Sequence, residues 1–223
     1  MKLKYLALGI FLVLVIAGCP ALQPIVPQER KGTSAQGGKQ PIAAEKTQAA
    51  QLIAPDIKDL LGKSSTRVKS LSYMYKGPES PNDAIAFMVK GNKVKYIPPR
   101  MVRSLDLPDA IDSLFIDTAA KTAKSYCDAL PCKYRGLKQN LSYSLNYIMT
   151  PLDWNFGIKD ARKIGEEVIE SRSTWKIETD KGTMWIDDYY GIPFKVVKDG
   201  KEYRFSNMAI NKVTDDQVVP SSG

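Results

Sequence analysis

The C-terminal part of the chain alternates between short apolar segments and turn residues, and this alternation constrains the fold most. Four segments are predicted as strands, at residues 166–179, 182–187, 192–198 and 201–213. The breaks between them read "DKG", "DDYYG" and "KDGK", and each contains Asp and Gly, which accept turn dihedrals that other residues resist. The pattern predicts a run of β-hairpins.

Several upstream segments have the same character. Residues 68–77 alternate with the two-residue period of a strand. Residues 84–98 contain two short strands joined at a Gly-Asn pair, which is typical of a tight hairpin. Two further strands surround "DTAAK" within residues 112–127, and "LSYSLNYI" from Leu141 predicts another. Most of the folded chain is therefore expected to be sheet.

Helices are expected in two places. Residues 56–66, "DIKDLLGKSST", predict a short helix that ends near Gly62, with an aspartate in the first turn where it favours the helix dipole. Residues 150–165 predict a turn and a short helix with Pro151 near its start. Residues 99–111 fit either a short helix or a long crossing loop.

The N-terminus has the order of a secretory signal. Lys2 and Lys4 precede an apolar run that is too short to cross a bilayer, which needs about 20 apolar residues. The run ends in "IAGC", which resembles the lipobox of prokaryotic lipoproteins. On that resemblance residues 1–18 are removed and Cys19 carries lipid. The alternatives are a short uncleaved anchor, or an ordinary signal peptide with a chance cysteine.

The segment after Cys19 is rich in Pro, Gln, Gly, Lys and Ala and has no aromatic residue up to Ala50. Such a composition cannot bury enough apolar surface to offset its chain entropy. Residues 19–50 are therefore predicted to be a lipidated cysteine followed by a flexible tether. Residues 51–223 remain, about 170, which is enough for one domain with a hydrophobic core.

Charge argues against one class of partner. The net charge is +8, from 32 basic and 24 acidic residues. Removing Lys2 and Lys4 with the signal leaves 30 basic residues and a net charge of +6. The basic residues form no block interleaved with aromatics, so nucleic-acid binding is not expected. A basic face near anionic lipid head groups is the more natural use of this charge.

The residue inventory also argues against common catalytic machinery. The chain has no histidine, which excludes the usual Ser-His-Asp and Cys-His centres and the His ligands of zinc and iron sites. Nucleotide-binding glycine motifs are absent too. Asp187 and Asp188 end a strand, where aspartates usually accept bonds from nearby backbone N–H groups. Acid–base chemistry or cation binding there is the weaker alternative, so we expect no catalytic residue, no metal and no cofactor.

Two covalent features are expected in the middle of the chain. If Cys19 carries lipid, Cys127 and Cys132 remain, and an oxidising compartment favours a disulfide between them. Unpaired thiols or half of a metal site are the alternatives. Asn140 begins "NLS", a formal N-glycosylation acceptor.

Aromatic residues concentrate in the C-terminal strands. They have two interpretations: ordinary core of a sheet packed on a helix, or the wall of an apolar pocket. The candidate wall residues are Trp175, Trp185, Phe194, Tyr203 and Phe205.

Residues 166–220 resemble the closing half of the LolA/LolB-like lipoprotein-carrier superfamily. The resemblance is carried by Trp185-Ile186-Asp187, Gly191-Ile192-Pro193, Phe205-Ser206-Asn207 with Ile210-Asn211, Asp215-Asp216 and Pro220. It implies an α+β fold in which a strongly curved antiparallel sheet forms an unclosed half-barrel, with short helices covering its concave face. It also implies a cavity for acyl chains and no catalysis.

Two departures from that pattern shape the expected function. The 127–132 loop is not part of it, and the arginine with which periplasmic carriers release lipoproteins has no assigned counterpart here. A lipidated Cys19 would also hold the protein at the cell membrane, facing the extracytoplasmic side, where a shuttle could not diffuse. We therefore expect a non-enzymatic, membrane-tethered lipoprotein that binds a lipid or an acylated protein.

The alternative function is a protein-interaction or envelope-sensing module that uses the same fold as a scaffold. Its contact surface would be the basic loop 127–140, with Lys133, Arg135 and Lys138.

Overall fold

The computed structural model describes residues 53–98 and 104–221. All of them belong to one compact unit, Thr47–Gly223, whose own hydrophobic core allows it to fold as an independent domain. The predicted signal peptide, the lipidation of Cys19 and the tether lie outside the described residues, as does the start of the ambiguous segment 99–111. In the described part of 99–111, residues 104–111 form turns and irregular chain.

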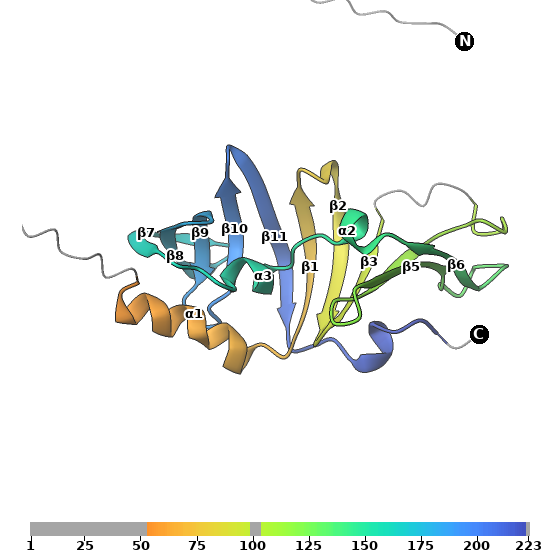
Figure 1. The fold of residues 1–223 in the computed structure, drawn as a ribbon, viewed down its shortest axis with the longest axis horizontal. Coiled ribbons are helices and arrows are strands. Elements are labelled where there is room, and N and C mark those ends of the chain that lie inside the picture. The colour runs from red at the N-terminus through yellow and green to blue at the C-terminus, as the bar shows by residue number, and fades with distance from the viewer. Residues whose placement is uncertain (1–52, 99–103, 222–223) are drawn as a thin grey trace, which may run out of the picture. The chain divides into compact units, whose positions relative to one another are not determined.

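The core of the fold is one antiparallel sheet of eleven strands, in the order β6-β5-β4-β3-β2-β1-β11-β10-β9-β8-β7 (Figure 1). The order follows the chain except at one place, where β1 pairs with β11, so the last strand joins the two halves of the sheet. The strands are β1 Ser70–Gly77, β2 Ser80–Lys90, β3 Lys93–Ile97, β4 Ser113–Asp117, β5 Thr122–Cys127, β6 Gly136–Leu141, β7 Ala161–Ile169, β8 Arg172–Thr179, β9 Gly182–Asp187, β10 Pro193–Lys198 and β11 Lys201–Ile210.

The sheet is open and curved. Among the described residues β6 and β7 are its two edges, and they do not pair with each other. The turn between β7 and β8 nevertheless reaches β11, three strands further along the sheet, where the Glu170 carboxylate accepts a hydrogen bond from the Asn207 N–H at 3.0 Å. The expected α+β fold with an unclosed half-barrel is confirmed.

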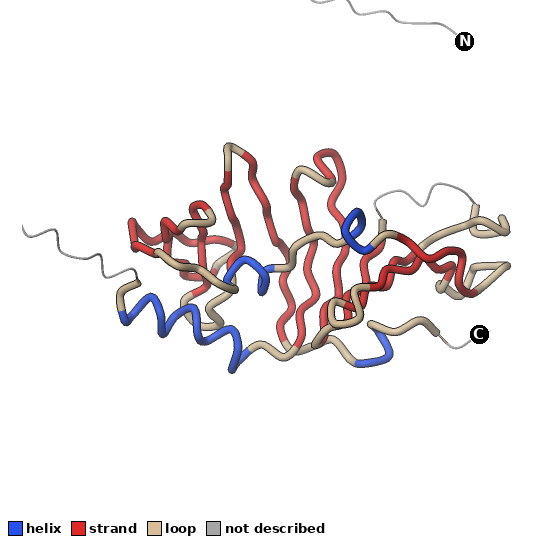
Figure 2. Tube along the Cα trace, in the orientation of Figure 1, coloured by secondary structure: helices blue, strands red, loops and turns tan. Residues whose placement is uncertain are grey.

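Short helices lie against the concave face (Figure 2). They are α1 Pro55–Arg67, α2 Tyr143–Asn146 and α3 Pro151–Asn155, and a 3₁₀ turn, η1 Asp215–Gln217, follows the last strand. Helix α1 contacts β7, α2 contacts β5 and α3 contacts β10. No helix in the described part of the chain is both long and apolar enough to span a membrane.

Helix α1 continues past its predicted end. The glycine at 62 suggested termination there, yet the helix runs to Arg67. A glycine inside a helix costs about 1 kcal/mol, and later residues of α1 offset that cost. The Lys63 ammonium donates to the carbonyl of Asp188 at 2.7 Å, and the Arg67 guanidinium donates to the carbonyl of Tyr189 at 2.7 Å.

Aromatic rings form the centre of the core on the concave face. Tyr73 and Phe87 stack at 5.2 Å between centroids, and Phe87 stacks on Tyr96 at 5.1 Å. The Phe205 ring, on β11, makes an edge-to-face contact with Tyr73, with 5.6 Å between the ring centroids. The Tyr96 hydroxyl donates to the carbonyl of Asn146 at 3.1 Å, which ties the chain at α2 to the sheet.

Several strand predictions hold and two were wrong. The Gly-Asn hairpin joins β2 to β3, and strands flank "DTAAK" as expected. Residues 166–179 are not one strand, because Glu170 and Ser171 adopt positive φ values of 50° and 62° and form a turn without glycine. The strand predicted from Leu141 is wrong, since β6 ends there and α2 follows. The short helix predicted within 150–165 with Pro151 near its start is confirmed as α3, which ends at Asn155, and β7 begins at Ala161.

Candidate functional site

A hollow on the concave side lies beneath the chain that leads into α3. It has a volume of about 250 Å³. Four of its lining residues are aromatic, and charged residues come from the β1–β2 and β10–β11 turns. The lining residues are Tyr75, Glu79, Tyr147, Ile148, Met149, Trp154, Lys198, Asp199, Lys201 and Tyr203. We call this hollow the inner cavity.

Local bonds fix the covering segment 147–155 over the sheet. Thr150 caps α3 in a reciprocal box with Asp153, and Pro151 occupies the first turn, where its missing N–H costs nothing. The Asp153 carboxylate also accepts from the Tyr147 hydroxyl at 2.6 Å. These bonds aim Trp154 at the sheet, where its ring meets that of Tyr203 at 4.8 Å.

Two buried donors beside the inner cavity have no acceptor among the described residues. They are the Tyr73 hydroxyl and the Trp154 indole N–H. Burial raises the pKa of Tyr73 well above its usual value, and the nearby Asp153 carboxylate and the Tyr147 hydroxyl raise it further. Buried polar groups are nearly always hydrogen-bonded, so these two orphan donors require an explanation.

The rim of the inner cavity is polar. The Tyr75 hydroxyl donates a short hydrogen bond to Glu79, and burial together with that bond raises the pKa of Tyr75 strongly. Burial, then the charges of Glu79 and Asp199, raise the pKa of Tyr203. Glu79 therefore lies close to both phenols, between the β1–β2 and β10–β11 hairpins.

The chain on either side of the covering segment presents apolar side chains to solvent. Leu145 is 85% exposed and Phe156 is 82% exposed, while Met149 bridges the surface and the inner cavity. The inner cavity itself is smaller than the roughly 300–1,000 Å³ of typical ligand sites. A long apolar ligand would need this segment to move outward, which would also uncover the two orphan donors.

The five predicted wall residues lie in different parts of the structure. Tyr203 lines the inner cavity. Phe194 and Phe205 are buried in the same core and border a separate hollow of about 280 Å³ next to the β7–β8 turn. Trp175 packs against the core from β8, with the Lys163 ammonium 3.5 Å from its ring centre.

Trp185 points to the opposite, convex face. Its register partners on β8 and β10 are Lys176 and Lys195, whose ammonium groups lie 4.9 Å and 3.6 Å from the indole centre. Its alternation with Met184 and Ile186 in the sequence already indicated this orientation, because successive strand residues face opposite sides of a sheet.

Three aromatic residues of the inner cavity were not among the predicted wall residues. Tyr75 could have been found because it lies on the same face of a predicted strand as Tyr73. Trp154 and Tyr147 carried no comparable signal, because they lie in a short irregular segment whose position over the sheet depends on long-range packing.

The Asp187 carboxylate stabilises the turn that follows β9. It accepts hydrogen bonds from the backbone N–H groups of Tyr189 at 3.1 Å and Tyr190 at 2.5 Å, and from Arg172 at 3.4 Å. It is only 2% exposed. This is the ordinary turn role that its position at a strand end indicated, and it leaves little of the carboxylate for other chemistry. Asp188 donates its backbone N–H to the carbonyl of Ser173.

The predicted disulfide between Cys127 and Cys132 is present. Asp112 lies beside it and accepts from the N–H groups of Asp128 and Ala129, at 2.9 Å and 2.6 Å. These two cysteines and Asp112 are close enough to suggest a metal site, but the disulfide leaves no thiolate ligand. Asn140 lies exposed on β6.

Comparison with known proteins gives similarities of fold only. No protein-family model matches the sequence, and no curated protein matches it. Among solved structures, MucB is similar with a TM-score of 0.46 and 12% identity over 76% of this chain, which spans 64% of MucB, less than two thirds. LprF from Mycobacterium bovis is similar with a TM-score of 0.42 and 14% identity, over 76% of this chain and 99% of LprF.

A third similar structure is titled as an outer membrane lipoprotein-sorting protein domain from Vibrio parahaemolyticus. Its TM-score is 0.33 with 10% identity, over 73% of this chain and 94% of that one. At these identities and TM-scores the three similarities carry no information about ligand or partner.

Proposed function

We propose that the protein is an exported, membrane-tethered lipoprotein that binds a hydrophobic ligand, a lipid or an acylated protein, on the concave face of its half-barrel. Lipid on Cys19 would hold it at the extracytoplasmic side of the cell membrane, and residues 20–50 would be the tether. Binding requires no catalytic group, so no enzymatic step is part of the proposal.

The pair of orphan donors carries this proposal. A buried polar group without a partner costs about 1–3 kcal/mol, and these two donors are among five such side-chain atoms in the described residues. The Tyr73 hydroxyl and the Trp154 N–H flank aromatic walls that suit an acyl chain, and an ester or carboxyl oxygen at the end of that chain would accept their bonds. In this interpretation the described conformation is the closed, empty state.

The proposal is tested with a long-chain fatty acid and the 47–223 domain. Saturating ligand at about 100 times its Kd should stabilise the domain by about 2.7 kcal/mol, measured as a rise in the unfolding midpoint. Tyr203→Lys places a charge in the inner cavity and should abolish that rise. Tyr134→Lys, the same exchange at an exposed loop position, should keep it. An equal rise in the wild type and in Tyr203→Lys would refute binding at this site.

The second candidate function, a protein-interaction module, is favoured by one observation on the 127–140 loop. Leu130 is 88% exposed beside the disulfide, and Tyr134 and Leu137 are also exposed. Apolar side chains fixed in this way next to Lys133 and Arg135 would suit an acidic protein surface. Replacing Lys133, Arg135 and Lys138 by glutamine should then weaken capture of the protein partner, and unchanged capture would remove the loop from consideration.

A further inference from the structure

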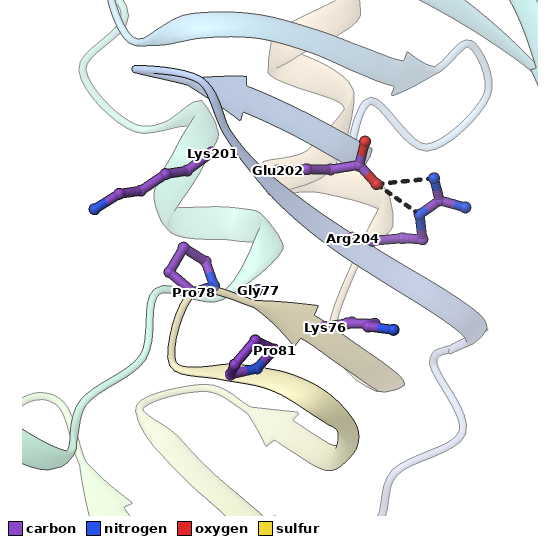
Figure 3. Close-up of a pocket in the computed structure, with 7 residues that line it drawn as sticks. All are labelled: Lys76, Gly77, Pro78, Pro81, Lys201, Glu202 and Arg204. Atoms are coloured by element: carbon purple, nitrogen blue, oxygen red, sulfur yellow. Dashed lines mark hydrogen bonds and ion pairs between the residues drawn. The ribbon is translucent and has the colours of Figure 1, made fainter.

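A second hollow lies on the convex face, directly across the sheet from the inner cavity (Figure 3). Its volume is about 340 Å³. It is lined by Lys76, Gly77, Pro78, Pro81, Lys201, Glu202 and Arg204. In Figure 3 the two prolines lie along the β1–β2 hairpin, the Glu202–Arg204 pair lies on β11, and Lys76 and Lys201 point outward on either side. We call it the outer hollow.

The outer hollow exists because the sheet splits at this point. The register between β1 and β11 ends at Lys76 and Arg204, and β1 then turns away at Gly77. Strand β11 begins three residues earlier, at Lys201, so its residues 201–203 pair with β10 but have no partner on β1. The β1–β2 and β10–β11 hairpins therefore diverge toward their tips, as Figure 1 shows.

The two hollows open on the two sides of this split. Strand alternation sends Tyr75 and Tyr203 to the inner cavity, while Lys76, Glu202 and Arg204 face the outer hollow. Lys201 lines both. Gly77 allows the arrangement, since a Cβ there would overlap the ring of Tyr75, which lies across the inner side of the split.

Charge differs between the two sides. On the outer side Lys76 and Lys201 make no ion pair or hydrogen bond through their side chains in the described part of the protein. Arg204 donates two N–H groups to the Glu202 carboxylate, at 3.0 Å and 2.8 Å, and its other N–H groups remain available to a ligand. On the inner side the acidic Glu79 lies between Tyr75 and Tyr203, with Asp199 nearby. The outer hollow has three cations and one carboxylate, whereas Lys198 and Lys201 balance the two carboxylates of the inner cavity, so an anion would be attracted to the outer side.

We propose that the split is the passage for the ligand, and that the ligand is an anionic amphiphile. Its head group is bound in the outer hollow by Lys76, Lys201 and Arg204. Once the Tyr75 ring has turned aside, the ligand's ester group and apolar chain pass between the two hairpins, so that the ester oxygen reaches the Tyr73 and Trp154 donors and the chain fills the inner cavity. The prolines suit this passage, because they offer apolar surface and no N–H groups that would seek a partner there.

This inference rests on the proposed function, and the test separates the two. The probes are lyso-phosphatidylglycerol and lyso-phosphatidylcholine with the same brominated acyl chain, added to the 47–223 domain below their micelle concentrations. Bromine quenches a nearby indole, so a chain in the inner cavity should quench Trp154. The quenching should disappear in Trp154→Phe, because Trp175 lies on β8 and Trp185 faces the convex side.

We expect the anionic lipid to bind about tenfold more tightly than the zwitterionic one, since three exposed cations each contribute a fraction of a kcal/mol. The variant Lys76→Gln, Lys201→Gln, Arg204→Gln should remove this preference, so that the two lipids bind with equal affinity. The matched control Lys133→Gln, Arg135→Gln, Lys138→Gln removes the same charges elsewhere and should retain the preference.

Each other result overturns one of the two proposals. Equal binding of both lipids, with Trp154 quenched and no effect of the three outer-hollow substitutions, would refute the anionic head-group site and leave the hydrophobic binder standing. A preference for the anionic lipid without quenching of Trp154 would show surface binding and refute the passage. If neither lipid bound the domain, the proposed function would fall as well.

Discussion

The clearest consequence of the orphan donors is that removing one should stabilise the empty protein. In Tyr73→Phe the ring, its stacking on Phe87 and its burial remain, and only the hydroxyl is lost. Because that hydroxyl has no partner among the described residues, its desolvation penalty of about 1–3 kcal/mol disappears with it. The free energy of unfolding should rise by that amount, and the unfolding midpoint by about 2–12 °C for a domain of this size.

Tyr96→Phe is the matched control. Tyr96 lies in the same aromatic row, but its hydroxyl donates to the carbonyl of Asn146. The exchange should therefore lower the free energy of unfolding by about 0.5–1.5 kcal/mol, because a hydrogen bond is lost. The two Tyr→Phe exchanges are thus expected to have opposite signs, which thermal and denaturant unfolding of the ligand-free domain would measure.

Tyr73→Phe should also weaken ligand binding. A bound ester or carboxyl oxygen would lose one buried hydrogen bond in Tyr73→Phe, and the affinity for a fatty acid should fall by about five- to tenfold. A Tyr73→Phe domain that is less stable than the wild type, with unchanged affinity, would refute the reasoning, because the hydroxyl would then have a partner in the empty state.

Three further predictions concern the scaffold. Gly191→Ala should destabilise the domain by at least about 1 kcal/mol in denaturant unfolding, because its φ is +69° and a Cβ would overlap the carbonyl of Leu60 in α1; wild-type stability would contradict this. Replacing both Cys127 and Cys132 by alanine should cost about 2 kcal/mol, as expected for a short closed loop, and equal midpoints with and without a reductant would contradict it. Burial raises the pKa of Tyr96 to about 12, above the value of about 10 in the unfolded chain. The contribution of Tyr96 to the free energy of unfolding is therefore complete below pH 10, and about 2–3 kcal/mol is lost as the pH rises through 12. An alkaline stability profile that stays flat would contradict this assignment.

The sequence predicts the hairpins better than it predicts their assembly. Alternation and Gly-containing turns located β2, β3, β4, β5, β9 and β10 because those signals are local. The turn at Glu170 and Ser171 was missed, since two non-glycine residues adopt positive φ there and tertiary contacts hold them, including the bond from Glu170 to Asn207. The pairing of β1 with β11 joins residues about 130 positions apart, so no local pattern could indicate it.

The inner cavity was predictable only in part. Tyr203 was expected from the C-terminal strands, whereas Tyr75 was not predicted although the alternation in β1 could have indicated it. Trp154 depends on how α3 lies over the sheet, and that position is fixed by the bond from Asn155 to the carbonyl of Gly191, 36 residues away. The split between the hairpins arises from a difference in strand ends, which pattern reasoning places only to within about 2–4 residues.

The most direct test of the central claim is to ask what the concave face holds. The 47–223 domain would be produced in an exporting host, purified without detergent, extracted with organic solvent and analysed by mass spectrometry. The account predicts an amphiphile with an anionic head group at close to one molecule per domain in the wild type, and its loss from Tyr203→Lys. A folded wild-type domain that yields no lipid, even after incubation with lipid vesicles from the same host, would contradict the account.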